Sequence, residues 1–61
     1  MATWVWRAWS GRRRTIEADR VEFAPEHVMF YGSALQPILA VKNIDCNDLH
    51  PESEGDPEWW T

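Results

Sequence analysis

Apolar and polar residues alternate along the first segment of the chain. Between residues 3 and 9, Trp4 and Trp6 fall on one face of an extended segment, while Val5 and Trp9 fall on the other. Alternation that uses aromatic and β-branched residues is typical of a strand. A Ser-Gly pair follows and indicates a turn. The pattern therefore predicts a first strand near residues 3–9, with Trp4 and Trp6 in the core and Trp9 on the surface.

The alternation slips by one position inside the second segment, residues 14–23. Ile16 and Ala18 share one parity, whereas Val21 and Phe23 share the opposite parity. A slip of one residue requires a β-bulge or a bend, because side chains on a strand repeat every second residue. The sequence therefore predicts a long strand that bends in its middle.

The stretch "VEFAPEHVMFY" predicts a hairpin, since proline favours the second position of a tight turn. Two further strands are expected near residues 27–31 and 37–42. The later stretch "DCNDLHP" fits either a helical turn or a short last strand. The predicted core residues are Ile16, Val21, Phe23, Val28, Phe30, Leu39 and Val41.

Strands that recur every eight to twelve residues, with turn signals between them, predict an all-β fold. We expect a small four- to five-stranded SH3-like or Sm-like barrel, or a curled antiparallel sheet, because small barrels need a sharp bend to close. Residues 1–50 would form this β domain. Residues 51–61 are acidic, contain two tryptophans and lack aliphatic side chains, which predicts a flexible, disordered tail.

The stretch "ADRVEFAPEHVMFYGS…ILAV" resembles small uncharacterised β-modules found in actinobacteria and their phages. The resemblance covers the middle half of the chain and consists of alternation and turns. It implies a fold and a phage setting, and it implies no activity.

Length and cysteine content limit how the fold can be stabilised. The chain has 61 residues, five tryptophans and one cysteine, so an intrachain disulfide is excluded. A single cysteine favours a reducing compartment, the cytoplasm, which would be the host's if the chain is phage-encoded. No stretch has the length of a membrane span or the pattern of a secretory signal, so no membrane association is expected. A small core without a covalent staple predicts self-association, with Trp9, Met29 and Tyr31 at the interface.

Few residues could carry covalent or metal chemistry. Cys46 and His50 could form a nucleophile–base pair, or they could be a half-buried thiol beside a surface histidine. Together with His27, Asp45 and Asp48 they are also candidate metal ligands, but structural zinc sites normally pair several Cys or His residues at short spacings. The chain has no glycine-rich loop for an oxyanion hole. We therefore predict a non-enzyme without catalytic residues, metal or cofactor.

The charge is distributed unevenly between the two ends. Residues 1–20 hold five arginines and two acids, a balance of +3, whereas the residues after Lys42 hold six acids and no base, a balance of −6. This split predicts that the acidic segment folds back toward Arg12–Arg14, with Trp59 or Trp60 stacked on a guanidinium group.

Three functions are compatible with these features. The first is a non-enzymatic protein-interaction module, such as a phage-encoded modulator or inhibitor of a host protein, that binds through an exposed β edge, the Trp9 surface or the tail. The alternative is a small nucleic-acid-binding β-barrel that uses the arginine cluster and an exposed tryptophan, although the net charge of −4 disfavours it. The third is a structural subunit of a larger assembly, such as a virion. The candidate partner-binding residues are Arg7, Trp9, Arg12, Arg13, Arg14, Met29, Tyr31, Trp59 and Trp60.

Overall fold

The computed structural model describes residues 2–60, which form β-strands joined by turns and short 3₁₀ segments, with no α-helix in this range. The strands are β1 (Ala2–Arg7), β2 (Arg13–Ala18), β3 (Arg20–Phe23), β4 (His27–Tyr31), β5 (Pro37–Lys42) and β6 (Asn47–Pro51). The 3₁₀ segments are η1 (Ser33–Leu35), η2 (Asn43–Asp45), η3 (Glu52–Glu54) and η4 (Glu58–Trp60). The predicted all-β class is confirmed, and "DCNDLHP" contributes both the end of a 3₁₀ turn and a last strand.

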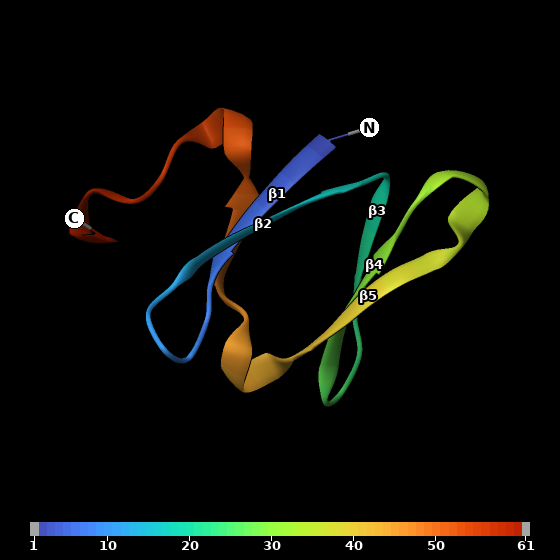
Figure 1. Cartoon of the computed structure of the whole chain (residues 1–61), viewed down its shortest axis with the longest axis horizontal. Helices are drawn as coiled ribbons and strands as arrows, with labels where there is room; N and C mark the ends of the chain where they lie inside the picture. Colours follow the sequence, from blue (N-terminus) through green and yellow to red (C-terminus); the bar gives the residue numbers. More distant parts are fainter. Residues whose placement is uncertain (1, 61) are drawn as a thin grey trace.

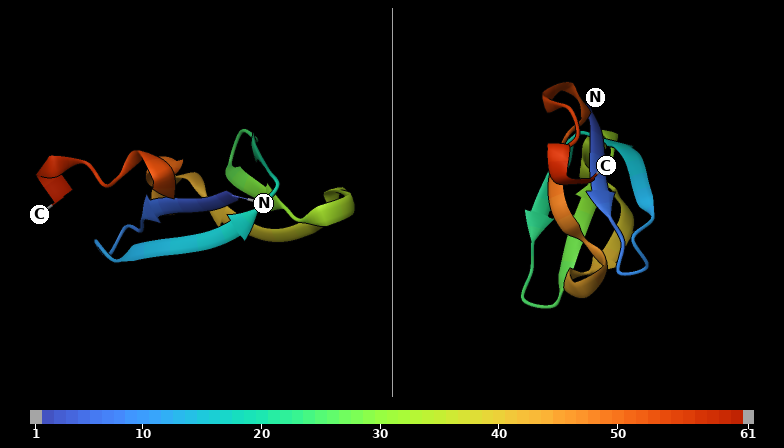
Figure 2. Two further views of the ribbon diagram at one scale, coloured as in Figure 1. Left: turned by 90° about the horizontal axis from the view of Figure 1, so that it is seen from above. Right: turned by 90° about the vertical axis from the view of Figure 1, so that its left-hand side faces the viewer.

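The strands form two antiparallel sheets of three strands each. Sheet A has the order β2-β1-β6, and sheet B has the order β3-β4-β5 (Figure 1). No strand pairing joins one sheet to the other within the described residues, so neither the predicted closed barrel nor a single curled sheet is formed. The reason is that β2 and β5 are both edge strands and carry no ladder between them. The two sheets instead pack on each other (Figure 2).

The predicted bend lies at Asp19, where the chain leaves sheet A and enters sheet B. Ala18 ends β2 and Arg20 begins β3, so the pairing partner changes from β1 to β4. The amide of Asp19 donates a hydrogen bond to the carbonyl oxygen of Tyr31 at 2.8 Å, which anchors the corner. The one-residue slip in the alternation is therefore the signature of a strand that changes sheets.

The first hairpin is shorter than the sequence predicts. β1 ends at Arg7, and Ala8 starts the turn, where its amide donates to the carbonyl oxygen of Arg12 at 2.9 Å. The amide of Gly11 donates back to the carbonyl oxygen of Ala8 at 2.8 Å. Gly11 has a φ of +89°, a conformation that favours glycine because it has no Cβ. The turn predicted at Ser10-Gly11 is thus confirmed, but Trp9 belongs to it rather than to the strand.

The hydrophobic core lies between the two sheets. Trp6, Ala18, Val28 and Phe30 are its buried members, and the rings of Trp6 and Phe30 stack with their centroids 5.0 Å apart. Around them, half-buried side chains complete the core: Trp4, Ile16, Val21, Leu39, Val41, Cys46 and Leu49. The predicted core is therefore confirmed at six of its seven positions.

Phe23 is the exception, with 75% of its surface exposed. Its parity was predicted correctly, because it pairs with the buried Val28 across the β3–β4 ladder. However, it is the last residue of an edge strand, and sheet A does not extend over that corner. The prediction of Phe23 as a core residue is wrong because alternation identifies the face of a strand and says nothing about how far the opposite sheet reaches.

A second buried site lies on the outer face of sheet A. Val5 is fully buried although it points away from the Trp6 face of β1 and is not part of the core cluster. The chain after β6 packs on β1 through η3 (Figure 2). His50, which pairs with Val5, has a side chain that is only 12% exposed. The flexibility of residues 51–61 stays a prediction, and the ends of the predicted segments, Met1 and Thr61, lie outside the described residues.

Candidate functional site

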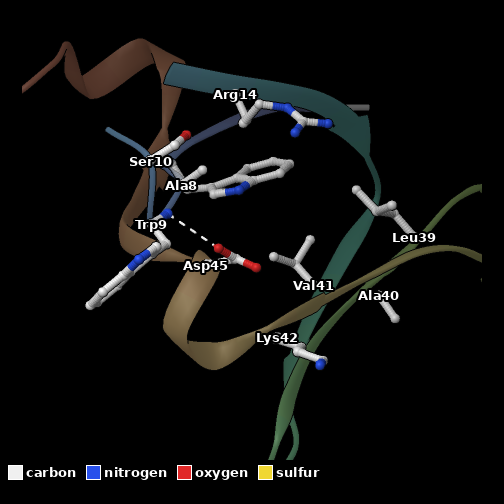
Figure 3. Close-up of a pocket in the computed structure, with 10 residues that line it drawn as sticks. Ala8, Trp9, Ser10, Arg14, Leu39, Ala40, Val41, Lys42 and Asp45 are labelled. Atoms are coloured by element: carbon white, nitrogen blue, oxygen red, sulfur yellow. Dashed lines mark hydrogen bonds between the residues drawn. The ribbon is translucent and has the colours of Figure 1, made fainter. Parts of the chain in front are cut away.

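An open cleft of about 560 Å³ runs between the edge strands β2 and β5, where the two sheets fail to close (Figure 3). Its walls come from the β1–β2 hairpin, from β5 and from η2. The lining residues are Trp6, Ala8, Trp9, Ser10, Arg14, Leu39, Ala40, Val41, Lys42 and Asp45. The cleft is therefore a direct consequence of the open seam.

The floor of the cleft is apolar and continuous with the core. Leu39 pairs with Phe30 and Val41 pairs with Val28, so both face the interior side of sheet B. Figure 3 shows Leu39 and Val41 on the β5 side of the cleft and Arg14 beside β2 on the opposite wall. A side chain inserted here would meet aliphatic carbon below and a guanidinium group above.

Trp9 stands at one end of the cleft on a tethered loop. Its backbone amide donates to Oδ1 of Asp45 at 3.2 Å, which ties the hairpin to η2. The side-chain amide of Asn47 donates to the carbonyl oxygens of Arg7 at 3.1 Å and Ile44 at 3.3 Å, which adds a second tie. The Trp9 side chain is nevertheless 78% exposed. A large apolar surface is thus held in place without being buried, as predicted for this residue.

The predicted cluster Arg12–Arg14 is divided between two faces of sheet A. Arg13 pairs with Arg7 and lies on the outer face, whereas Arg14 pairs with the buried Trp6 and lies on the cleft side. Nε of Arg13 donates to Oδ2 of Asp56 at 2.8 Å, so this guanidinium group is occupied. Because the two neighbouring side chains point in opposite directions, the three arginines do not form one basic patch.

The acidic segment does fold back onto an arginine, as the charge split predicts. Asp56 accepts from Arg13, and its other oxygen lies 3.4 Å from Nε2 of His50. The hydrogen bond from Arg13 is the main cause that lowers the pKa of the Asp56 carboxyl below its usual range. Trp60 packs edge-on against the His50 ring at 5.2 Å rather than on a guanidinium group, while Trp59 remains 66% exposed.

Met29 and Tyr31, predicted to lie at a self-association interface, are half-buried on the outer face of sheet B. Met29 pairs with Ala40 on one side and with Glu22 on the other, and Tyr31 pairs with Arg20. They lie on the opposite side of sheet B from the Leu39–Val41 floor. The structure therefore does not bring them together with Trp9.

Cys46 and His50 do not form a reactive pair. Cys46 packs against the core, and burial raises the pKa of its thiol to about 11, which disfavours the nucleophilic thiolate at neutral pH. His50 lies on the outer face, where Nδ1 is 2.7 Å from the carbonyl oxygen of Asp48. Within residues 2–60, no three His, Cys, Asp or Glu side chains gather as a metal site requires.

Sequence reasoning predicted only Trp9 and Arg14 among the residues that line the cleft, and it missed the contributions of Leu39, Val41, Lys42 and Asp45. The first two were recognised only as core, because nothing in the chain indicates that β5 lies opposite a gap. Asp45 was named among the candidate metal ligands, whereas in the structure its carboxylate accepts a hydrogen bond from the Trp9 amide.

Comparison with protein-family models, with curated proteins and with solved structures finds no match to this chain. The described residues also contain no helix with the length and hydropathy of a transmembrane span.

Proposed function

We propose that this chain is a non-enzymatic protein-interaction module that binds an extended segment of another protein in the cleft between β2 and β5. The observation that carries the proposal is the coincidence of an open apolar cleft, two unpaired strand edges and an exposed, tethered Trp9. The partner is another protein, a host factor if the chain is phage-encoded.

Strand addition supplies the physical basis for binding. An edge strand presents unpaired backbone N–H and C=O groups, which can pair with an incoming extended segment. Such a segment along β5 would place alternate side chains on the floor formed by Leu39 and Val41. Trp9 at the end of the cleft is of the type that dominates binding energies at interfaces, because it buries a large area with little loss of side-chain freedom.

The chain order adds an argument by analogy. The chain has a bent strand that passes from one three-stranded sheet to the other, and a 3₁₀ turn precedes the last strand. This arrangement is similar to the SH3-like architecture expected from the sequence, except that the two sheets are not joined between β2 and β5. Small folds of this kind commonly present their binding surfaces between loops, although fold alone does not determine function.

Nucleic-acid binding is the alternative that the arginines suggest. It is disfavoured because Arg13 and Arg14 face opposite sides of β2, Arg13 is paired with Asp56, and the chain has a net charge of −4. Single-strand binders need a basic groove that follows the phosphate backbone. Such a groove is not formed by a cluster divided in this way.

The proposal is tested by selecting displayed random peptides against the immobilised chain and measuring the affinity of the selected peptides by fluorescence anisotropy. The deciding comparison is between Trp9→Ala and Trp59→Ala, because both residues are exposed tryptophans and only Trp9 borders the cleft. A hot-spot residue is worth 2 kcal/mol or more, so we expect Trp9→Ala to weaken binding about 30-fold.

Trp59→Ala should leave the affinity of the selected peptides unchanged. If the two variants behave alike, the cleft is not the binding site. If no peptide is selected, while single-stranded DNA binds with a steep dependence on salt, the nucleic-acid function holds instead.

A further inference from the structure

Two basic side chains that make no ion pair within residues 2–60 lie at the cleft. The chain has six Lys and Arg residues. Three of them are engaged: Arg7 with the carbonyl oxygen of Gly11, Arg13 with Asp56 and Arg20 with Glu22. Two of the other three, Arg14 and Lys42, line the cleft, and within residues 2–60 neither makes an ion pair or a side-chain hydrogen bond.

Negative charge is nearly absent from the same walls, although acids outnumber bases in the whole chain. Asp45 is the one carboxylate among the lining residues, and its Oδ1 accepts from the Trp9 amide. The site is therefore locally basic on a protein whose net charge is −4. With Arg14 and Lys42 against Asp45, the lining carries a net charge of +1, which an acidic ligand complements.

The strand geometry determines where those carboxylates would lie. Along β5, Leu39 and Val41 face the cleft floor, while Lys42 has the opposite parity and pairs with His27. In a segment added to the β5 edge, one set of alternate side chains would meet the floor and the other set would lie beside Lys42. Arg14 lies on the facing wall (Figure 3), so its charge acts on the whole segment from across the cleft.

We infer that the cleft selects an extended segment in which acidic residues alternate with large apolar ones. This inference rests on the proposed function and specifies the partner's chemistry. The apolar residues would cover the floor between Leu39, Val41 and Trp6, and the carboxylates would lie beside Lys42, with the charge of Arg14 across the cleft adding to their attraction. Unpaired basic groups around an apolar floor disfavour a basic segment by like-charge repulsion and so supply specificity.

The test compares two capped peptides, Glu-Val-Glu-Phe-Glu-Val-Glu and Lys-Val-Lys-Phe-Lys-Val-Lys, which share one apolar face and differ in charge. Binding to the full chain is measured by NMR titration of backbone amides at low and physiological salt. We expect the acidic peptide to bind at least about 10-fold more tightly, to shift amides of β5 and the Trp9 hairpin, and to lose affinity as salt increases.

Charge-reversal variants locate the effect. Lys42→Glu and Arg14→Glu should each lower the affinity for the acidic peptide and raise the affinity for the basic peptide. Arg20→Glu is the matched control, because Arg20 lies in β3, away from the cleft, and is already paired with Glu22. It makes the same change in net charge and should leave the preference between the peptides unaltered.

The outcomes separate this inference from the proposed function. The inference of selectivity for acidic segments is wrong if both peptides bind at the cleft with equal affinity, or if Arg20→Glu changes the preference as much as Lys42→Glu does. In either case the proposed binding of an extended segment in the cleft still stands. If neither peptide binds, the proposed function itself fails. If light scattering finds a dimer that Lys42→Glu dissociates and the acidic peptide does not, the occupant is a second copy and the inference is overturned.

Discussion

The two phenylalanines of the chain provide a sharp test of the fold, because the sequence predicts both in the core and the structure buries only one. Phe30 is fully buried and stacks on Trp6 at 5.0 Å, whereas Phe23 is 75% exposed. Truncating a buried Phe to Ala costs about 3–5 kcal/mol. A chain of 61 residues has a total stability of about 3–9 kcal/mol. Phe30→Ala should therefore remove most of the stability or unfold the protein.

Phe23→Ala makes the same chemical change at the surface and should alter stability by no more than about 0.5 kcal/mol. Urea denaturation followed by tryptophan fluorescence and by near-ultraviolet circular dichroism gives both values. A loss of 1 kcal/mol corresponds to about 4–8 °C in melting temperature for a domain of this size. Similar losses in the two variants would mean that another element covers Phe23 and that the packing of the sheets described above is incorrect.

Three further predictions concern the thiol and the acidic segment. Cys46 should react slowly with iodoacetamide at pH 8, where a pKa of about 11 leaves about one thiol in 1,000 ionised, and should react rapidly once the chain is unfolded. Asp56→Asn should lower stability at neutral pH, and the difference from the unmodified chain in urea denaturation should disappear as pH falls through the depressed pKa of Asp56, because the carboxylate stabilises the fold only while it is ionised beside Arg13. Deleting residues 52–61 should lower the urea midpoint and expose Val5, which hydrogen-exchange rates of β1 would detect.

Most of the fold follows from local patterns in the sequence. Alternation placed four strands within a few residues of their observed bounds, and the one-residue slip indicated the corner at Asp19. These features are predictable because the period of a strand and the chemistry of a turn are properties of neighbouring residues. Closure of the barrel was not predictable from such patterns, since it depends on whether β2 and β5 come within hydrogen-bonding distance.

The acidic segment, residues 51–61, makes contacts that its amino-acid composition does not predict. Its lack of aliphatic residues predicts a flexible tail, which stays a prediction, and composition did not indicate that Trp60 packs on His50 and that its Nε1 donates to Oδ2 of Asp48 at 3.3 Å. The partner surface for this segment is created only when β6 pairs with β1 and puts His50 beside Val5. Composition cannot indicate such a surface, because its residues come from both ends of the chain.

The same open seam that forms the proposed binding site also exposes two strand edges, which in other proteins promote aggregation. Natural edges are protected by proline and by charged side chains, and both are present here: Pro37 begins β5, Lys42 ends it, and Arg14 faces it from β2. Only the interval from Ile38 to Val41 lies between these protecting groups. A basic segment at this edge would meet the like charges of Lys42 and Arg14, whereas an acidic segment would be attracted by both. The features that keep the seam from pairing indiscriminately are therefore the same features that would select its ligand.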